Sequence, residues 1–296
     1  MLGALGEPPD LLVVQGDTSS ALGGALAGFR AGLPVAHVEA GLRSHDAAMP
    51  WPEEGYRTAI DAGAMLLFAP TALAAANLRD EQVAGAVFIT GNTGIDAVLR
   101  ASAALPAATL RESGVPRLLV TCHRRESWDS GLAAVASALR QIAEAGTAAI
   151  DVLLHPNPHV SGMLERLLGG CPGIALLAPC SHAGLLALMR DCDLMLSDSG
   201  GVQEEAPAMG VPLLVLRDKT ERPEAIWSGN MQLVGTGTKQ IVEAVGALLG
   251  NPVKLAAMAR PCLPYGDGLS GHRIAGIIDQ WLAGSASARA RSSGKW

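Results

Sequence analysis

Three acidic side chains near the start of the chain occupy positions from which a carboxylate can move a proton. Asp17 follows the apolar run at 10–15, and Glu39 follows the apolar run at 34–38. Both runs are predicted strands, and residues that follow parallel strands face the ligand-binding edge of a sheet. Glu53 lies in the sequence Pro-Trp-Pro-Glu-Glu. A carboxylate held at such a site can act as a general acid or base.

Two of these acids have an alternative role in helix geometry. Asp17 could cap the helix predicted from Thr18 onward, because an aspartate oxygen accepts hydrogen bonds from the amides at a helix start. Glu53 could open a helix after Pro52, where acids are favoured. Glu39 is harder to explain in this way because it ends a buried strand and is followed by Ala-Gly. Its carboxylate is expected to face a ligand-binding cleft.

Histidine and arginine residues follow two later predicted strands. The strand at 117–121 leads into His-Arg-Arg-Glu, and the strand at 150–154 leads into His-Pro-Asn. His123 could be a core histidine, but the two arginines beside it indicate a cationic site that faces an anion. The polar residues of these two strand ends are His123, Arg124, Arg125, His155 and Asn157.

A phosphate-binding turn is predicted where the strand at 193–197 ends. The turn Ser199–Gly201 precedes a predicted helix, and its glycines would let a phosphate approach the backbone and the helix N-terminus. A plain tight turn would use the same residues. Glu204 and Glu205 are expected in the first turn of that helix, where the helix dipole favours acids. Glu205 could instead bind ribose hydroxyls, which with the phosphate turn suggests a nucleoside diphosphate.

Short apolar runs alternate with helical patterns along the chain, which predicts right-handed βαβ units and parallel sheets. The runs are continuous rather than alternating in polarity, as expected for strands buried on both faces. The predicted strands are 10–15, 34–38, 65–69, 86–90, 117–121, 150–154, 174–177, 193–197, 212–216 and 231–234. The helical stretches include 18–31, 71–79, 131–144, 201–209 and 238–249. The predicted fold is α/β, with two Rossmann-like lobes and a cleft between them.

A segment with two prolines, at 101–116, is predicted to connect the lobes. We expect a first lobe over residues 1–108 and a second lobe, which carries the phosphate-binding turn, over residues 109–284. Residues 285–296 are small, polar and basic, and are predicted to form a disordered tail. Because four predicted strands precede the connection and six follow it, the first lobe is expected to be incomplete.

The composition excludes several classes of protein. A net charge of −6 without a basic stripe argues against nucleic-acid binding. The five cysteines form no C-x-x-C pair, which indicates neither a zinc site nor a disulfide framework and fits a reducing cytoplasm. The sequence shows no secretory signal and no membrane-spanning apolar stretch. Neither a metal nor an organic cofactor is expected.

Several longer motifs occur in order along nearly the whole chain. They are VVQGDTSSALGGALAGFRAGLPVAHVEAGLRS, PWPEE, FAPT, ITGNTGIDAV, VTCHRRESW, HPNPHV, LSDSGGVQEEAPAMGVPLLVLRDKTERPEA and PYGDG. Together they resemble the non-hydrolysing UDP-N-acetylglucosamine 2-epimerases. The resemblance implies a glycogen-phosphorylase-like (GT-B) fold, a homodimer and interconversion of UDP-N-acetylglucosamine and UDP-N-acetylmannosamine. It also implies a route through removal of the C2 proton, with elimination and re-addition of UDP.

The resemblance further implies roles for individual residues. The acid and base candidates are Asp17, Glu39 and Glu53, with His123 beside the diphosphate. The residues expected to hold the UDP moiety are Ser199, Gly200, Gly201, Glu205 and Arg222. A second, regulatory UDP-N-acetylglucosamine would contact Arg124, His155 and Asn157. Cys180 and Leu185 belong to a predicted substrate-binding segment, where relatives often place Tyr and Phe near the uracil.

Four positions depart from the family pattern. Cys122 stands before His-Arg-Arg-Glu, where relatives usually have Gly. Tyr56 precedes Arg57, where Asn is usual. His182 and Leu185 replace aromatic residues, and loss of a stacking face is expected to weaken uracil binding by about 1 kcal/mol. None of these departures changes the candidate carboxylates.

Other functions stay open on sequence alone. A UDP-sugar glycosyltransferase of the same fold would need an acceptor, and a hydrolysing epimerase would release free N-acetylmannosamine. A catalytically inactive UDP-binding remnant is the third alternative. Family members carry a further upstream βαβ portion with a Gly-Thr-Arg-Pro-Glu-type loop, which no residue here matches. Without it the strand at 10–15 is expected to have an unpaired edge, and the chain alone to be inactive or unstable.

Overall fold

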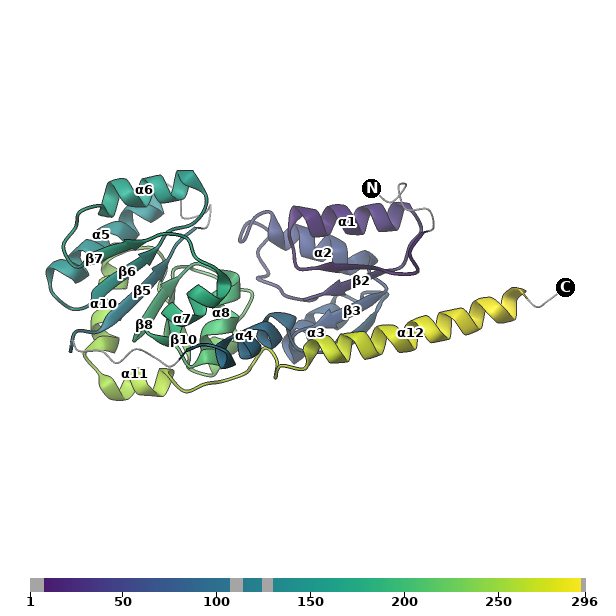
Figure 1. Cartoon of the computed structure of the whole chain (residues 1–296). Helices are drawn as coiled ribbons and strands as arrows, with labels where there is room; N and C mark the ends of the chain where they lie inside the picture. The colour runs from purple at the N-terminus through teal and green to yellow at the C-terminus, as the bar shows by residue number, and fades with distance from the viewer. Residues whose placement is uncertain (1–7, 107–113, 124–129, 294–296) are drawn as a thin grey trace. The chain divides into compact units, whose positions relative to one another are not determined.

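The computed structural model describes residues 8–106, 114–123 and 130–293. The chain divides into two compact units, each built on its own parallel sheet (Figure 1). The first unit comprises Met1–Asp96 and Tyr265–Trp296, and the second comprises Ala97–Pro264. This division differs from the single boundary expected at residue 108, because the end of the chain returns to the first unit.

The first unit contains a four-stranded parallel sheet in the order β1-β2-β3-β4, with β1 at one edge. Its strands are β1 (Leu12–Gln15), β2 (Val35–Val38), β3 (Leu66–Ala69) and β4 (Ala86–Ile89). The helices that follow them are α1 (Ser19–Arg30), α2 (Glu53–Gly63), α3 (Ala72–Asp80) and α4 (Thr93–Ala103). Every residue of β2 and β3 is buried, as expected for strands whose sequences are apolar apart from His37.

The last helix, α12 (Ser270–Ser293), packs against the sheet of the first unit (Figure 1). Ile274 of this helix is buried in one cluster with Val38 of β2 and Phe68 of β3. The helix continues through 285–293, where the sequence predicted a disordered tail. Alanine and arginine, which recur in this stretch, are strong helix formers.

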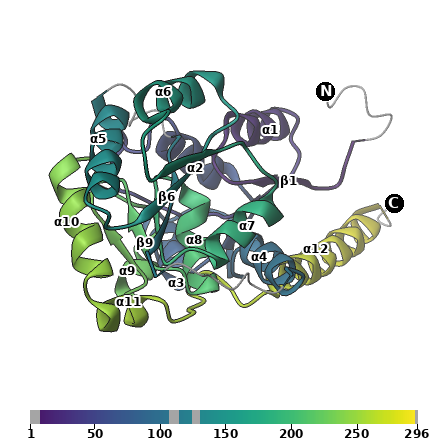
Figure 2. The ribbon, with the colours of Figure 1, turned by 60° about the vertical axis from the view of Figure 1, so that its left-hand side comes forward.

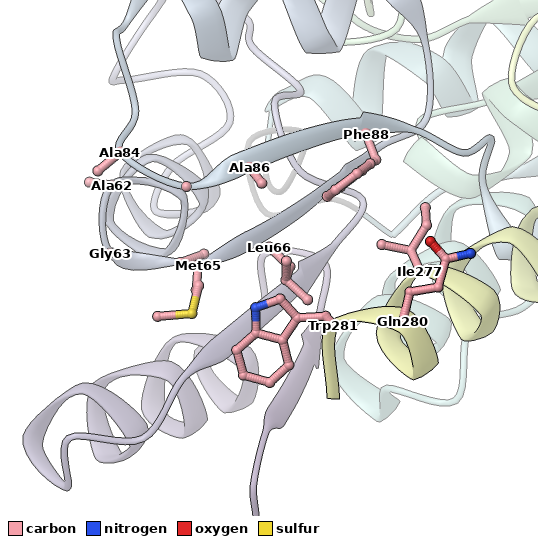
Figure 3. Close-up of a pocket in the computed structure, with 12 residues that line it drawn as sticks. Ala62, Gly63, Met65, Leu66, Ala84, Ala86, Phe88, Ile277, Gln280 and Trp281 are labelled. Atoms are coloured by element: carbon pink, nitrogen blue, oxygen red, sulfur yellow. The ribbon is translucent and has the colours of Figure 1, made fainter. Parts of the chain in front are cut away.

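A pocket of about 640 Å³ lies between α12 and the beginnings of β3 and β4. Trp281 and Ile277 of α12 line one side of it, and Met65 and Phe88 line the other (Figure 3). The pocket lies at the end of the sheet opposite to the strand ends that carry the candidate carboxylates, because Met65 precedes β3.

The second unit contains a six-stranded parallel sheet in the order β10-β9-β8-β5-β6-β7. Its strands are β5 (Arg117–Thr121), β6 (Ala149–Leu153), β7 (Ile174–Leu177), β8 (Leu194–Ser197), β9 (Leu213–Val215) and β10 (Met231–Leu233). With the first sheet, these strands match all ten predicted runs to within two residues at each end. The α/β fold with two parallel sheets is therefore confirmed.

Helices lie between and after the strands of the second unit, within the part of the chain that the structure describes. They are α5 (Ser130–Glu144), α6 (Pro158–Leu168), α7 (His182–Arg190), α8 (Gly200–Met209), α9 (Glu224–Trp227), α10 (Thr238–Leu249) and α11 (Pro252–Met258). Helices α5 and α10 lie side by side (Figure 2), and Thr238 Oγ1 donates to Ala134 O at 2.8 Å between them. In the described parts of the chain, no single helix is long and apolar enough to cross a membrane; α10 and α11 meet that test only as a pair bent by 98°.

Candidate active site

The turns that carry Asp17 and Glu39 leave the first sheet at the same edge. β1 and β2 are parallel neighbours, with Gln15 opposite Val38. The residues that follow these two positions therefore emerge together. A Cβ placed on Gly16 would lie 3.6 Å from Glu39 Oε2, so the Glu39 carboxylate stands beside the turn that leads into Asp17. The structure thus brings these two predicted residues into one neighbourhood.

Glu39 has a backbone conformation that is uncommon for a residue with a side chain. Its φ is 71°, in the left-handed region that glycine usually occupies. The amides of Glu39 and Ala40 both donate to the carbonyl of Phe68 at 3.1 Å, so the end of β3 fixes this turn. Backbone strain of this kind persists where the surrounding structure over-determines it, and it is frequent at active sites.

Asp17 is held by an ion pair and does not cap a helix. Its Oδ2 lies 2.6 Å from Nη2 of Arg57, whose side chain is only 2% exposed. Helix α1 is capped instead by Thr18, whose Oγ1 accepts from the amide of Ala21 at 3.2 Å. The capping alternative for Asp17 is therefore wrong, and its carboxylate is oriented by a cation from α2.

Glu53 is the first residue of α2 and follows Pro52 directly, which confirms its predicted structural position. At that position the carboxylate oxygen Oε2 is buried and has no hydrogen-bond partner in the described residues. This oxygen is therefore available to a ligand. Arg57 lies one turn along the same face of the helix. Its Nε and Nη1 atoms also lack hydrogen-bond partners within the described ranges. Because buried polar atoms usually have partners, this part of α2 is suited to holding a polar ligand.

A buried polar network next to these turns contains residues that the sequence did not single out as site residues. His37 Nδ1 in β2 lies 2.6 Å from Asp61 Oδ1 in α2, and Asp61 Oδ2 lies 2.8 Å from Arg43 Nη2. Arg43 also donates through Nε and Nη2 to the two oxygens of Glu81, at 2.7 Å each. The available signal was a histidine inside an otherwise apolar strand, since a fully buried histidine needs polar partners.

Polar residues of the second unit gather where its strand order reverses. In an open parallel sheet, ligands bind outside the carboxyl ends of the strands at such a point. His123 follows β5, and its amide donates to both carboxylate oxygens of Asp198, at 2.9 and 3.1 Å. His123 Nδ1 lies 3.2 Å from Asp198 Oδ1. Asp198, which follows β8 and was not among the predicted site residues, therefore orients His123.

The rings of His123 and His155 stack, with centroids 5.0 Å apart and planes at 7°. Burial lowers the pKa of His155, and the neighbouring charge of His123 lowers it further, while Asp198 acts in the opposite direction. The amide of Asn157 donates to His155 Nδ1 at 3.1 Å. Since Nδ1 accepts that bond, the neutral ring carries its proton on Nε2.

Several predicted site residues line one pocket of about 160 Å³ in the second unit. They are His123, His155, Cys180, Leu185 and Ser199. Cys122, one of the departures from the family pattern, also lines this pocket. Burial raises the pKa of the Cys122 thiol well above its usual range, and Asp198 raises it further. This thiol therefore stays neutral and is no nucleophile.

The predicted phosphate-binding turn lies at the start of α8. Ser199 is the residue before the helix, and its amide donates to Ser197 Oγ at 3.0 Å. A Cβ added to Gly201 would meet nothing within 4 Å, so open space adjoins this backbone. The N-terminal end of a ten-residue helix favours an anion at that position.

The acids of α8 differ from their predicted position. The first turn of the helix contains no acid, because Gly200 is already helical and Glu204 lies one turn further. Glu204 is buried and lies 2.5 Å from Arg222 Nε. Arg222 also pairs with Glu221 and does not line the 160 Å³ pocket. Glu205 is partly exposed, and its Oε1 lies 2.9 Å from His182 Nε2.

Two further ligand contacts were predicted at Arg124 and Asn157. Arg124 lies outside the described residues, and Asn157 does not line the pocket. Asn157 caps α6, and its Oδ1 accepts from the amide of His159 at 3.0 Å. Across the described ranges, no group of three or more His, Cys, Asp or Glu side chains is placed to hold a metal ion.

Comparison with known proteins identifies the family. The family model described as UDP-N-acetylglucosamine 2-epimerase matches residues 5–279. A UDP-N-acetylglucosamine 2-epimerase from Yersinia pestis is 44% identical over 280 residues, which cover 90% of this chain and 74% of the relative. The corresponding enzyme from Escherichia coli (strain K12) is 42% identical over 282 residues, with 90% and 74% covered.

Solved structures agree with the sequence comparison. The UDP-GlcNAc 2-epimerase from Neisseria meningitidis, bound to UDP-GlcNAc, is 35% identical with a TM-score of 0.88, over 92% of this chain and 76% of that one. The Methanocaldococcus jannaschii UDP-GlcNAc 2-epimerase, in complex with UDP-GlcNAc and UDP, is 34% identical with a TM-score of 0.79, over 92% and 76%. Motifs, fold and relatives therefore agree that this chain belongs to the UDP-N-acetylglucosamine 2-epimerase family.

Proposed function

We propose that this chain interconverts UDP-N-acetylglucosamine and UDP-N-acetylmannosamine. The observation that supports this most directly is the group of carboxylates in the first unit. Asp17 and Glu39 stand in adjoining turns, and Glu53 on α2 has a buried oxygen without a hydrogen-bond partner in the described residues. The relatives, which are epimerases by name, favour this reaction over glycosyl transfer.

The reaction inverts a carbon whose proton is very weakly acidic. A base removes the C2 proton while the C1–O bond to UDP breaks, and the electron pair of that bond leaves with the diphosphate. The products of this step are 2-acetamidoglucal and UDP. In the second step a proton is added at C2 from the opposite face, and UDP adds back at C1. Departure of a stabilised diphosphate offsets the low acidity of the C2 proton.

Two faces of the sugar ring require two separate proton-transfer groups. We assign these roles to the set Asp17, Glu39 and Glu53. Glu39 is fixed by the end of β3, whereas Asp17 is fixed by Arg57. Groups held in this way are pre-oriented, which general acid and base catalysis requires.

We assign binding of the UDP moiety to the second unit. Ser199, Gly200 and Gly201 would bind phosphate at the start of α8, with His123 beside the diphosphate. Cys180 and Leu185, in the 160 Å³ pocket, are assigned to substrate binding. Glu205 would accept hydrogen bonds from the ribose hydroxyls in place of its present contact with His182. Arg222 would complete the nucleotide site.

Three further properties belong to the same proposal. The protein would act in the cytoplasm as a homodimer. A second UDP-N-acetylglucosamine would regulate it through Arg124, His155 and Asn157. His155 lines the pocket of about 160 Å³.

The test is to incubate the purified chain with UDP-N-acetylglucosamine alone and follow the sugar by proton NMR. The proposal predicts UDP-N-acetylmannosamine at equilibrium with the substrate, with no acceptor added. Free N-acetylmannosamine with UDP would indicate the hydrolysing reaction. Turnover only in the presence of an acceptor would indicate glycosyl transfer, and UDP binding without turnover would indicate an inactive remnant.

A further inference from the structure

The contacts of His37 indicate a second role for the buried network of the first unit. His37 lies in β2 and is fully buried. Its Nδ1 contacts Asp61 Oδ1 at 2.6 Å, and its Nε2 contacts the carbonyl oxygen of Gly16 at 3.0 Å. One imidazole ring thus joins the end of β1 to a carboxylate of α2.

The chemistry of these partners fixes the orientation of the ring. A carbonyl oxygen can only accept, so Nε2 carries a proton toward Gly16. Asp61 Oδ2 accepts from the amide of Gly41 at 3.1 Å and lies 2.8 Å from Arg43 Nη2. The contact of Nδ1 with Asp61 therefore links the ring to the loop at Gly41.

This pair is connected to both turns that carry the candidate carboxylates. Gly16, bound by His37, is the residue before Asp17 and has a φ of 68°. Gly41, bound by Asp61, lies two residues after Glu39 and has a φ of 84°. Both are conformations that glycine favours, so these turns depend on outside contacts to hold one arrangement.

We propose that His37 is a positioning residue: a buried ring that, with Asp61, fixes the Gly16 and Gly41 turns and thereby holds Asp17 and Glu39 at the reacting sugar carbon. The catalytic part of this proposal rests on the epimerase function proposed above. His37 contacts no reacting atom in this role and acts through the backbone of its neighbours.

Two substitutions separate the two contacts of the ring. His37→Asn keeps a donor near the position of Nδ1 and removes the contact with Gly16. His37→Gln keeps a donor near the position of Nε2 and removes the contact with Asp61. The matched control is His272→Asn, because His272 is an exposed histidine of the same unit on α12.

Kinetics should distinguish positioning from binding. Each His37 variant is expected to lower kcat by about 10- to 100-fold, the range for partners that orient a reacting group. KM should change little, because the proposed UDP-binding residues all belong to the second unit. His272→Asn should retain the kcat of the wild type. Unchanged kcat in both His37 variants would overturn the positioning role.

Amide hydrogen exchange gives a readout that does not need turnover. The amide of Gly16 donates to Val38 O at 3.0 Å, and the amide of Gly41 donates to Asp61. We expect His37→Asn to speed exchange mainly at Gly16 and His37→Gln to speed it mainly at Gly41, each by about tenfold or more. Equal, wild-type protection at both amides would contradict the proposal.

The protonation of the ring can be measured in the unaltered chain, whether or not the variants fold. Nitrogen NMR of His37 should show a proton on Nε2, the nitrogen that contacts the Gly16 carbonyl oxygen. A bare Nε2 would overturn the inference. If the wild type shows no epimerase turnover, the proposed function fails, while ring protonation and amide exchange still decide whether the pair fixes the two turns.

Discussion

At the scale of single residues, the chain separates proton-transfer candidates from nucleotide-binding candidates. Glu39 is held in a left-handed conformation beside the Gly16 turn, whereas Glu205 is a partly exposed acid on a helix of the second unit. These settings are chemically different. The first is suited to moving a proton, and the second to accepting hydrogen bonds from a sugar hydroxyl.

Substitution of Glu39 by Gln is expected to lower kcat by about 10²–10⁴, the usual contribution of an acid or base group. The amide keeps the size and polarity of the side chain but cannot transfer the proton, so UDP affinity should stay near that of the wild type. Steady-state kinetics and calorimetric titration with UDP measure the two quantities. Near-normal turnover with weakened UDP binding would show that Glu39 belongs to the nucleotide site.

Substitution of Glu205 by Ala is expected to give the opposite pattern. Loss of a charged hydrogen-bond acceptor should weaken UDP binding by about 1.5–3 kcal/mol. The rate of the chemical step at saturating substrate should change less than in Glu39→Gln. Calorimetric titration with UDP, followed by kinetics at saturating UDP-N-acetylglucosamine, would check this. Unaltered UDP affinity would remove Glu205 from the proposed site.

Because the pKa of His155 is lowered, the free energy of unfolding is expected to depend on pH below about pH 7. Its pKa in the folded chain lies below the ordinary value, so between the two values the unfolded chain binds more protons. The stabilisation linked to the neutral His155 ring is complete above about pH 6.5. It is lost as the pH falls through the pKa of His155 in the folded chain. The difference in unfolding free energy between wild type and His155→Gln should therefore shrink from about pH 7 to about pH 5. Urea denaturation measures it, and a difference that grows on acidification would contradict this assignment.

Residue positions at the ligand edge of a sheet were predictable where a strand end marked them. Contacts were unpredictable where the partner came from elsewhere in the chain. Asp17, Glu39, His123 and Ser199 all follow strands, and parallel strand ends face the ligand edge. The contact of His37 with Asp61 spans 24 positions, so only the packing of α2 beside β2 reveals it. The ion pair of Arg57 with Asp17 was likewise unpredictable, because the sequence marks Arg57 only by the unusual Tyr56 before it.

At the scale of elements, the strands were predictable because their apolar runs are continuous and short. The first residues of the helices were less predictable than the strands. The glycines of the predicted phosphate turn are themselves the first residues of α8, which moves Glu204 into the second turn and into a buried pair with Arg222. Propensity disfavours glycine in a helix, and the observed start is set by the end of β8.

The loop after β2 offers a test of packing at this scale. A Cβ on Gly41 would lie 2.2 Å from Ala74 O, and its φ is 84°. Gly41→Ala should therefore destabilise the first unit by more than about 3 kcal/mol. The matched control is Gly32→Ala, whose φ is 67° and whose added Cβ meets nothing within 4 Å; it should cost about 1–2 kcal/mol. Urea denaturation measures the unfolding free energy of each variant. Equal losses in Gly41→Ala and Gly32→Ala would contradict the close approach of α3 to this loop.

At the scale of the whole molecule, the chain forms two parallel-sheet units whose boundaries the sequence did not indicate. Composition marks the proline-containing stretch at 101–116, but α4 runs through its first residues and the chain end rejoins the first unit. No local pattern reports such a return, because it depends on the apolar face that the first sheet presents to α12.

Removing the contact between α12 and the sheet tests this organisation. Ile274 is 7% exposed and packs with Val38 and Phe68. Ile274→Ala should cost about 2–5 kcal/mol, and faster hydrogen exchange should appear in β2 and β3 before it appears in β5 and β8. His272→Ala, at an exposed position of the same helix, serves as the control. Uniform protection across both sheets in Ile274→Ala would show that α12 does not stabilise the first unit.

The central claim is that carboxylates of the first unit remove and return the proton at C2 of the sugar. The most direct measurement is turnover of UDP-N-acetylglucosamine in deuterated water, with the C2 position of both sugars followed by NMR. Deuterium is expected at C2 of UDP-N-acetylglucosamine and of UDP-N-acetylmannosamine, with much slower labelling in Glu39→Gln. Interconversion of the two sugars without deuterium at C2 would contradict this claim.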